Sequence, residues 1–290
     1  MTHAPAATAA GHLDRAKQQV HDAVQDVSPF IQRFARFGFA AKGVVYLIIG
    51  GLAALAPVGR TDKPVGTRGA LEHLFRQPIG AALLAVVALG LLCFGVWKLI
   101  RAIEDPEREG TSWGAIAKRV GWAFNAFVHF GLVLGAISLL IGSRRAASGE
   151  DQKLHDWTGA VMDYPFGRWI VAAIGVGVVC YGVKQVIDGC RGSLDKRLVL
   201  TEVGPGAKKW IRGVSRFGVA ARGVVFALMG LFLVKAAKDF DANQAHGLGG
   251  ALAELARQPY GPYLLGTVAL GLVAYGLYDF VLARWRHIRV

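Results

Sequence analysis

Residues 78–97 read PIGAALLAVVALGLLCFGVW, and these twenty residues contain no Asp, Glu, Lys or Arg. A helix that crosses about 30 Å of hydrocarbon needs roughly 20 mostly apolar residues. A buried helix of a water-soluble protein would carry an apolar stripe with a period of 3.6 residues, whereas residues 81–89 are apolar on every face. The stretch therefore predicts a transmembrane helix.

Five further apolar runs of this kind occur along the chain: 43–59, 120–143, 169–183, 223–234 and 258–278. Three of them are short between charges. Each reaches spanning length if a flanking cation, such as Lys42 or Arg222, extends its head group to the membrane interface. The sequence thus predicts an all-α, polytopic membrane protein with six transmembrane helices, and residues 1–27 contain no apolar segment of a cleavable signal.

The spans fall into a repeat. The sequence RFGFAAKGVVY at 36–46 returns as RFGVAARGVVF at 216–226, and a weaker copy, RVGWAFNAFVH, occupies 119–129. The second helix of each pair opens with PIG, PFG or PYG, and a glycine follows ten residues later. We therefore predict three parallel helical hairpins around a pseudo-threefold axis along the membrane normal. The predicted boundaries are a polar N-terminal segment at 1–33, repeats at 34–105, 117–191 and 214–284, a basic linker at 192–213 and a tail at 285–290.

These phrases, together with QPIG at 77–80 and QPYG at 258–261, resemble the bacterial domain-of-unknown-function family 1206. Members of that family are similar in consisting of repeated pairs of transmembrane helices, and the resemblance extends from about Phe34 onward. The middle copy departs from the pattern because Asn125 and Ala126 stand where the other copies have a cation and a glycine. The resemblance implies the architecture and a bacterial source, and it implies no activity and no site residues.

The charge distribution predicts the orientation. The chain has a formal net charge of +13, and 20 of its Lys and Arg residues lie in the tails and in the connections between repeats, against 11 in the connections within repeats. Because cytoplasmic loops carry the excess of Lys and Arg, both termini are expected in the cytoplasm, with the protein in the cytoplasmic (inner) membrane. Cations at span ends suit anionic lipid head groups, and they do not form the folded basic surface that nucleic acid requires.

Lys42 and Arg222 occupy equivalent positions in the first and third repeats. One interpretation is a ring of cations at the cytoplasmic mouth of a cavity, binding an anionic substrate or a lipid head group. The other interpretation, which we favour, is that both residues snorkel to the interface. Asp279 aligns with Lys98 and Gln185 at the ends of the second helices, so an interhelical ion pair of Asp279 with Arg222 or Lys42 is expected.

His129 is the only histidine inside a predicted span. Haem ligation would need a second axial ligand at a similar depth, but the equivalent residues are Tyr46 and Phe226. We therefore expect a polar contact between helices. The three cysteines form neither a metal-binding spacing nor a disulfide pattern, and the sequence predicts no cofactor.

Glycines recur at fixed positions of the repeat. Small residues allow transmembrane helices to approach closely, so they predict a tight bundle rather than a wide pore. The predicted packing positions are Gly43, Gly50, Gly90, Gly95, Gly131, Gly135, Gly177, Gly182, Gly223, Gly230, Gly271 and Gly276.

Residues 69–76 and 250–257 form short amphipathic stretches before a second helix, and we expect them to lie on the outer leaflet as interfacial helices. No motif of a known catalytic site occurs, which argues against an enzyme. Two functions remain open. The first, which we favour, is an interaction or accessory subunit of a membrane or envelope complex. The second is a small transporter or channel for an anionic or lipid-like substrate along the pseudo-threefold axis.

Overall fold

A computed structural model describes residues 30, 32–56, 64–104, 112–142, 150–192 and 203–286. Six helices in this part of the chain are long and apolar enough to cross a membrane. They are Gln32–Leu55, α3 (Gly80–Glu104), α4 (Trp113–Leu140), α6 (Gly167–Arg191), α7 (Pro205–Asp239) and α9 (Gly261–Trp285). The shorter elements are α2 (Thr67–Phe75), α5 (Glu150–Met162), the 3-10 turn η4 (Ala242–Gln244) and α8 (Leu248–Arg257).

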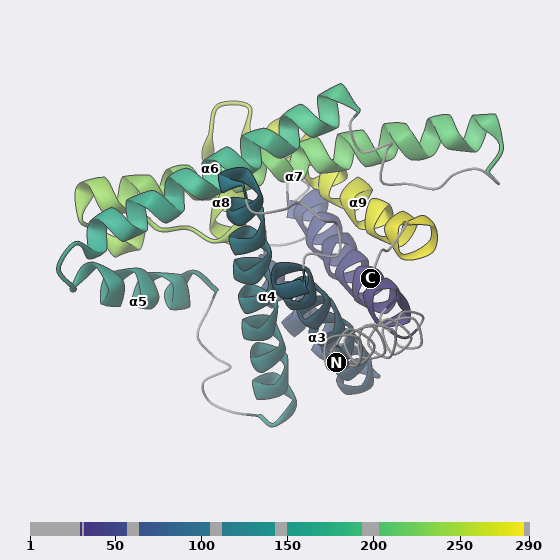
Figure 1. Cartoon of the computed structure of the whole chain (residues 1–290), viewed down its shortest axis with the longest axis horizontal. Coiled ribbons are helices and arrows are strands. Elements are labelled where there is room, and N and C mark those ends of the chain that lie inside the picture. The colour runs from purple at the N-terminus through teal and green to yellow at the C-terminus, as the bar shows by residue number, and fades with distance from the viewer. Residues whose placement is uncertain are drawn as a thin grey trace, which may run out of the picture.

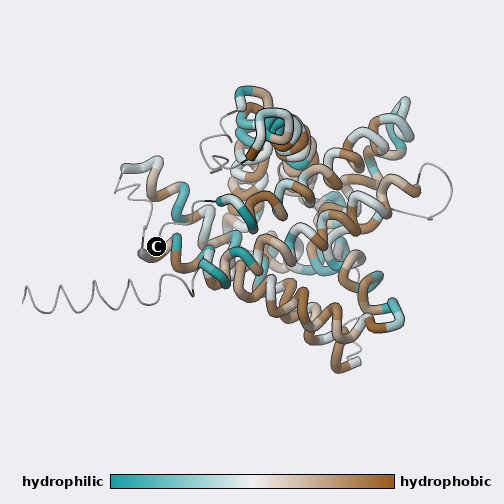
Figure 2. Tube along the Cα trace, turned by 90° about the vertical axis from the view of Figure 1, so that its right-hand side faces the viewer, coloured by the Kyte–Doolittle hydropathy of each residue, from teal (hydrophilic) through white to brown (hydrophobic). Residues whose placement is uncertain are grey.

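The helical character of the predicted protein is confirmed, with apolar residues along the spans and polar residues gathered toward their ends (Figure 2). One boundary differs from the expectation. The sequence predicts a basic linker at 192–213, but α7 begins at Pro205 and runs without a break into its apolar part. The last part of the predicted linker is therefore helical. The predicted N-terminal segment 1–33 lies outside the described residues apart from residues 30, 32 and 33.

A sharp corner leads from a short helix into each second span. At the first residue of these spans, a Cβ atom added to Gly80, Gly167 or Gly261 would collide with a carbonyl group of the preceding short helix. The residues before the last two glycines, Phe166 and Tyr260, have φ angles of 65° and 62°. The repeated Pro-x-Gly sequence is therefore explained by a corner too tight for any side chain at its third position.

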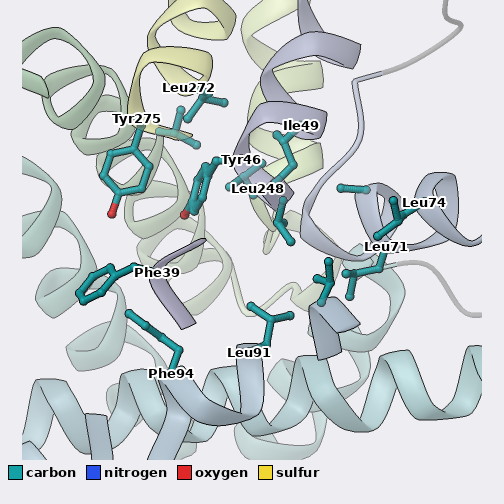
Figure 3. Close-up of a cluster of buried hydrophobic side chains, with 14 of the residues drawn as sticks. Phe39, Tyr46, Ile49, Leu71, Leu74, Leu91, Phe94, Leu248, Leu272 and Tyr275 are labelled. Atoms are coloured by element: carbon teal, nitrogen blue, oxygen red, sulfur yellow. The ribbon is translucent and has the colours of Figure 1, made fainter. Parts of the chain in front are cut away.

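The short helices pack inside the protein. Leu71 and Leu74 of α2 and Leu248 and Leu252 of α8 belong to the main hydrophobic core, together with residues of five spans (Figure 3). The expectation that these segments lie on the outer leaflet is therefore wrong for their apolar faces. The apolar faces of α2 and α8 cover one end of the bundle. Packing against the spans removes these faces from both water and lipid.

Glycines place the backbones of neighbouring spans in direct contact. An extended interface joins α6 and α7, which run side by side along the long axis of the molecule (Figure 1). A Cβ atom added at Gly182 would lie 2.5 Å from the backbone nitrogen of Ala227, and one added at Gly223 would lie 2.7 Å from the carbonyl oxygen of Gly182. The Gln32–Leu55 helix packs on α9 in the same way, since an added Cβ at Gly43 would lie 2.9 Å from the carbonyl oxygen of Gly276.

An arginine that recurs in the first spans ties each of them to the end of the span before it. Arg119 of α4 donates to the carbonyl oxygens of Ala102 and Ile103 in the last turn of α3, at 2.7 and 2.8 Å. The guanidinium of Arg216 in α7 lies against Gly192, the C-cap residue of α6. Arg119 thereby satisfies carbonyl groups that the C-terminus of α3 leaves free, and both cations oppose the negative dipole end of the preceding helix.

The middle repeat is built differently from the other two. In the first and third repeats, Gly90 packs on Ala41 and Gly271 packs on Ala221, so the two spans of each repeat touch. The equivalent glycine of the middle repeat, Gly177, has nothing within 4 Å of an added Cβ. Among the described residues, α4 packs on α3 and α6 packs on α7, with no extended contact between α4 and α6.

The repeats also differ at one position of the first span. Phe124 stands where the other repeats have Ala41 and Ala221, and a phenylalanine ring does not admit a glycine backbone as closely as an alanine does. Gly131 and Gly135 of α4 also have nothing within 4 Å. The prediction that these two glycines and Gly177 pack inside the chain is therefore wrong, because small residues mark a face suited to close contact without specifying which helix fills it.

Candidate functional site

Six polar residues from four spans meet inside the bundle, and we call them the central polar cluster. They are Lys42 and Tyr46 of the Gln32–Leu55 helix, Gln185 of α6, Arg222 of α7, and Tyr275 and Asp279 of α9. All six are buried, and Asp279 has 0% of its surface exposed. Ionisable side chains inside membrane spans are costly and mark functional sites by default, so this cluster is the first candidate.

In one half of the cluster, Lys42 contacts Asp279 and Tyr275 of α9. Its ammonium nitrogen lies 3.0 Å from Oδ1 of Asp279 and donates to the hydroxyl oxygen of Tyr275 at 2.9 Å. The same nitrogen lies 4.9 Å from the ring centroid of Phe94. A carboxylate, a hydroxyl and an aromatic face thus surround this cation, which offsets much of the cost of burying it.

Arg222 forms the other half. Its Nε donates to the hydroxyl oxygen of Tyr46 at 2.9 Å, and its Nη1 donates to the side-chain oxygen of Gln185. The guanidinium carbon lies 4.2 Å from the ring centroid of Phe226 and 4.8 Å from that of Tyr275. Arg222 therefore has hydroxyl, amide and aromatic partners, and none of these carries a negative charge.

The snorkelling interpretation of Lys42 and Arg222 is wrong. The two residues are 8% and 5% exposed, and Arg222 lies 17 residues after the start of α7, a rise of about 25 Å. The expected ion pair exists, but Asp279 takes Lys42 rather than Arg222 as its partner. The Arg222 side chain instead turns inward to Tyr46 and Gln185.

Aromatic pairs surround the cluster and join different repeats. Tyr46 packs against Tyr275, and the two hydroxyl groups point the same way (Figure 3), with ring centroids 4.7 Å apart. His129 packs against Phe94 at 4.7 Å, and Phe226 packs against Tyr181 at 5.7 Å. The three pairs occupy equivalent repeat positions, and each joins a first span to the second span of another repeat.

His129 makes a local contact as well as its contact between helices. Its Nδ1 lies 2.8 Å from the carbonyl oxygen of Asn125, one turn earlier in α4, and its ring packs on Phe94 of α3. The sequence predicts a polar contact between helices, but the contact of His129 with α3 is aromatic and its hydrogen-bond partner lies on its own helix. No group of three or more His, Cys, Asp or Glu residues within the described ranges could hold a metal ion.

The two tyrosines of the cluster are not among the site residues that the sequence predicts. Tyr46 and Tyr275 occupy the repeat positions of His129 and Phe94, so the alignment of repeats placed them in register with other singled-out residues. The hydrogen-bond partners of these tyrosines could not be predicted from the sequence, because the bonds Lys42–Tyr275 and Arg222–Tyr46 join residues 233 and 176 positions apart. Such a pairing appears only once the helices are packed.

A shallow hollow of about 240 Å³ lies away from the cluster, where α2, α5 and α8 meet. It is lined by Arg68, Glu72 and Asp151, and Oδ1 of Asp151 accepts a hydrogen bond from the backbone nitrogen of Gly247 at 2.8 Å. Arg68 pairs with Glu72 at 3.3 Å, one turn along α2. These polar groups are engaged in holding the short helices together, so the hollow offers a weaker site than the cluster.

Comparisons with known proteins agree with the repeat. The family described as Domain of Unknown Function (DUF1206) matches the chain three times, at residues 37–105, 120–192 and 217–286. An uncharacterized protein, YxxB of Bacillus subtilis (strain 168), is 32% identical over 263 residues, which cover 91% of this chain and 94% of that protein. No solved structure matches the chain significantly.

Proposed function

The chain belongs to the DUF1206 family, and on that premise we propose that it is a multi-pass protein of the bacterial cytoplasmic membrane that acts as an interaction subunit. Its partner would be a transmembrane segment of another protein. That segment would lie against α4 and α6, the two spans of the middle repeat. The observation that carries the proposal is that these two spans do not close on each other, whereas the spans of the other repeats do.

The faces of α4 and α6 have the chemistry of a helix-docking surface. Gly131 and Gly135 are spaced four apart on one face of α4, and Gly177 lies on α6, all without a neighbour within 4 Å. Lipid tails are as apolar as leucine, so spans associate through close van der Waals packing at small residues. The buried share of α4 and α6 is 22% each, against at least 39% in the other four spans, which leaves both faces available.

The proposed arrangement of the repeats supports the same function. Three parallel hairpins around a pseudo-threefold axis, with both termini in the cytoplasm, would place α4 and α6 as neighbours whose contact is left open. The contacts Lys42–Asp279 and Arg222–Gln185, each joining a first span to a second span of another repeat, support this arrangement. The open position between α4 and α6 is where the transmembrane segment of the partner would lie.

The experiment is affinity purification from native membranes in a mild detergent, comparing a Gly131→Leu/Gly135→Leu variant with the unaltered chain. Because the leucines fill the open face of α4, we expect a membrane partner to be lost while the variant itself is recovered in equal amount. Gly266→Leu is the matched control, since Gly266 also has open space around it but lies on α9. Retention of every copurifying protein by the double variant would refute the docking surface.

Transport remains a second candidate function because of the central polar cluster. Buried Lys42, Arg222 and Asp279 at the meeting point of the spans are typical of ion or substrate pathways. Reconstitution into liposomes, with flux of halide or phosphate measured against protein-free vesicles, separates the two functions. Flux that is lost in an Arg222→Gln variant and unaffected by the α4 leucines would favour transport over interaction.

A further inference from the structure

Two equivalent pairs in the central polar cluster differ by one charge. Lys42 and Arg222 stand at the same position of the first and third repeats, and Gln185 and Asp279 stand at the same position of the second and third. Lys42 pairs with the carboxylate of Asp279, whereas Arg222 pairs with the neutral amide of Gln185. The Arg222 pair therefore lacks the negative charge that its counterpart contains.

The Arg222 pair also leaves one buried hydrogen-bond donor without an acceptor among the described residues. The bonds to Tyr46 and Gln185 engage Nε and Nη1 of Arg222. The side-chain nitrogen of Gln185 is buried and has no hydrogen-bond partner among the described residues, in a side chain only 8% exposed. A buried donor without an acceptor is costly, so this part of the cluster favours a group that only accepts hydrogen bonds.

The charge balance points in the same direction. Lys42, Arg222 and Asp279 are all buried, and together they carry a net charge of +1. The rings of Phe226 and Tyr275 stabilise the guanidinium but do not neutralise it. An uncompensated charge inside a span is strongly unfavourable, and one monovalent anion would balance it.

We propose that Arg222 and Gln185 bind a small monovalent inorganic anion of the halide class. The guanidinium and the Gln185 amide would donate to it, beside the rings of Tyr181 and Phe226, whose centroids lie 5.9 and 4.2 Å from the guanidinium carbon. Tyr181 is 45% exposed on α6 and its ring lies beside the guanidinium, so we expect an anion to enter from that side. This site is independent of the proposed interaction function, since it involves neither Gly131 nor Gly135.

The test measures thermal unfolding of the purified full-length chain in detergent micelles. Sodium chloride or bromide is titrated against sodium gluconate at constant ionic strength, so that general screening does not change. We expect the unfolding midpoint to rise with halide concentration, because a ligand that binds only the folded state stabilises it. A midpoint that depends on ionic strength alone would overturn the proposal.

A Gln185→Glu variant makes the test specific to this site. The new carboxylate would supply the missing charge and convert the pair into the Lys42–Asp279 type. We expect a protein at least as stable as the unaltered chain in gluconate, with apparent halide affinity reduced by about tenfold or more. A halide response equal to that of the unaltered chain would overturn the proposal, since the anion would then bind elsewhere.

Two further arms complete the design. Lys184→Gln removes a neighbouring cation whose side chain is 58% exposed, and we expect the halide response to persist in this control. Inorganic phosphate added in place of halide identifies a site for lipid-phosphate chemistry. Stabilisation by phosphate without stabilisation by chloride or bromide would overturn the halide assignment.

Discussion

The middle repeat and its two neighbours show how one sequence pattern produces closed and open helix pairs. In the first and third repeats, Ala41 and Ala221 admit the glycine of the partner span, and both repeats contribute a buried cation to the cluster. In the middle repeat, Phe124 and Asn125 replace the alanine and the cation, and α4 and α6 remain apart. In both closed repeats, a small side chain faces the glycine of the partner span.

The largest effect is expected where the closed part of the molecule depends on charge. Asp279→Ala would leave Lys42 buried without its carboxylate, and removal of one partner from a buried ion pair costs about 3–5 kcal/mol. Unfolding in detergent should therefore shift strongly toward lower temperature or denaturant concentration. The double variant Lys42→Met/Asp279→Leu should recover most of the loss, and equal instability of both variants would contradict a role for the pair.

An intermediate effect is expected at a glycine that separates two touching backbones. Gly182→Val would push a methyl group into the backbone of Ala227 and should cost about 1–3 kcal/mol by overpacking. Gly177→Val on the same helix has open space and should change stability far less. The two variants are compared by thermal unfolding in the same detergent, and equal losses would contradict the difference between the closed and open faces of α6.

The smallest effect is expected at the position that distinguishes the middle repeat. Phe124 is 52% exposed, so Phe124→Ala should change the free energy of unfolding by no more than about 0.5 kcal/mol. Phe94→Ala is the reference, because the Phe94 ring is 2% exposed and its removal should cost about 3–5 kcal/mol. A large loss of stability in the Phe124→Ala variant, measured by denaturant unfolding, would mean that other residues fill the space next to this face of α4 in the folded protein.

Several features could be predicted from the sequence because they depend on local patterns. Charge-free runs identify the spans, and the Pro-x-Gly corners mark where the second spans begin. The ion-pair expectation for Asp279 was correct in kind, since repeat alignment placed an acid and a cation at neighbouring span ends. The cation that pairs with Asp279 could not be predicted, because Lys42 and Asp279 are 237 residues apart in sequence. The helix that carries Arg222 also begins earlier than the sequence predicts.

By itself, the sequence determined the family, the helical class and the six spans, because hydrocarbon thickness imposes a minimum apolar length on each span. Only the tertiary structure decided that Lys42 and Arg222 turn inward, that Tyr46 and Tyr275 complete their hydrogen bonds, and that α4 stays apart from α6. The physical reason is that a span's composition specifies its transfer into lipid, whereas its neighbours are chosen by the fit of individual side chains across the interface.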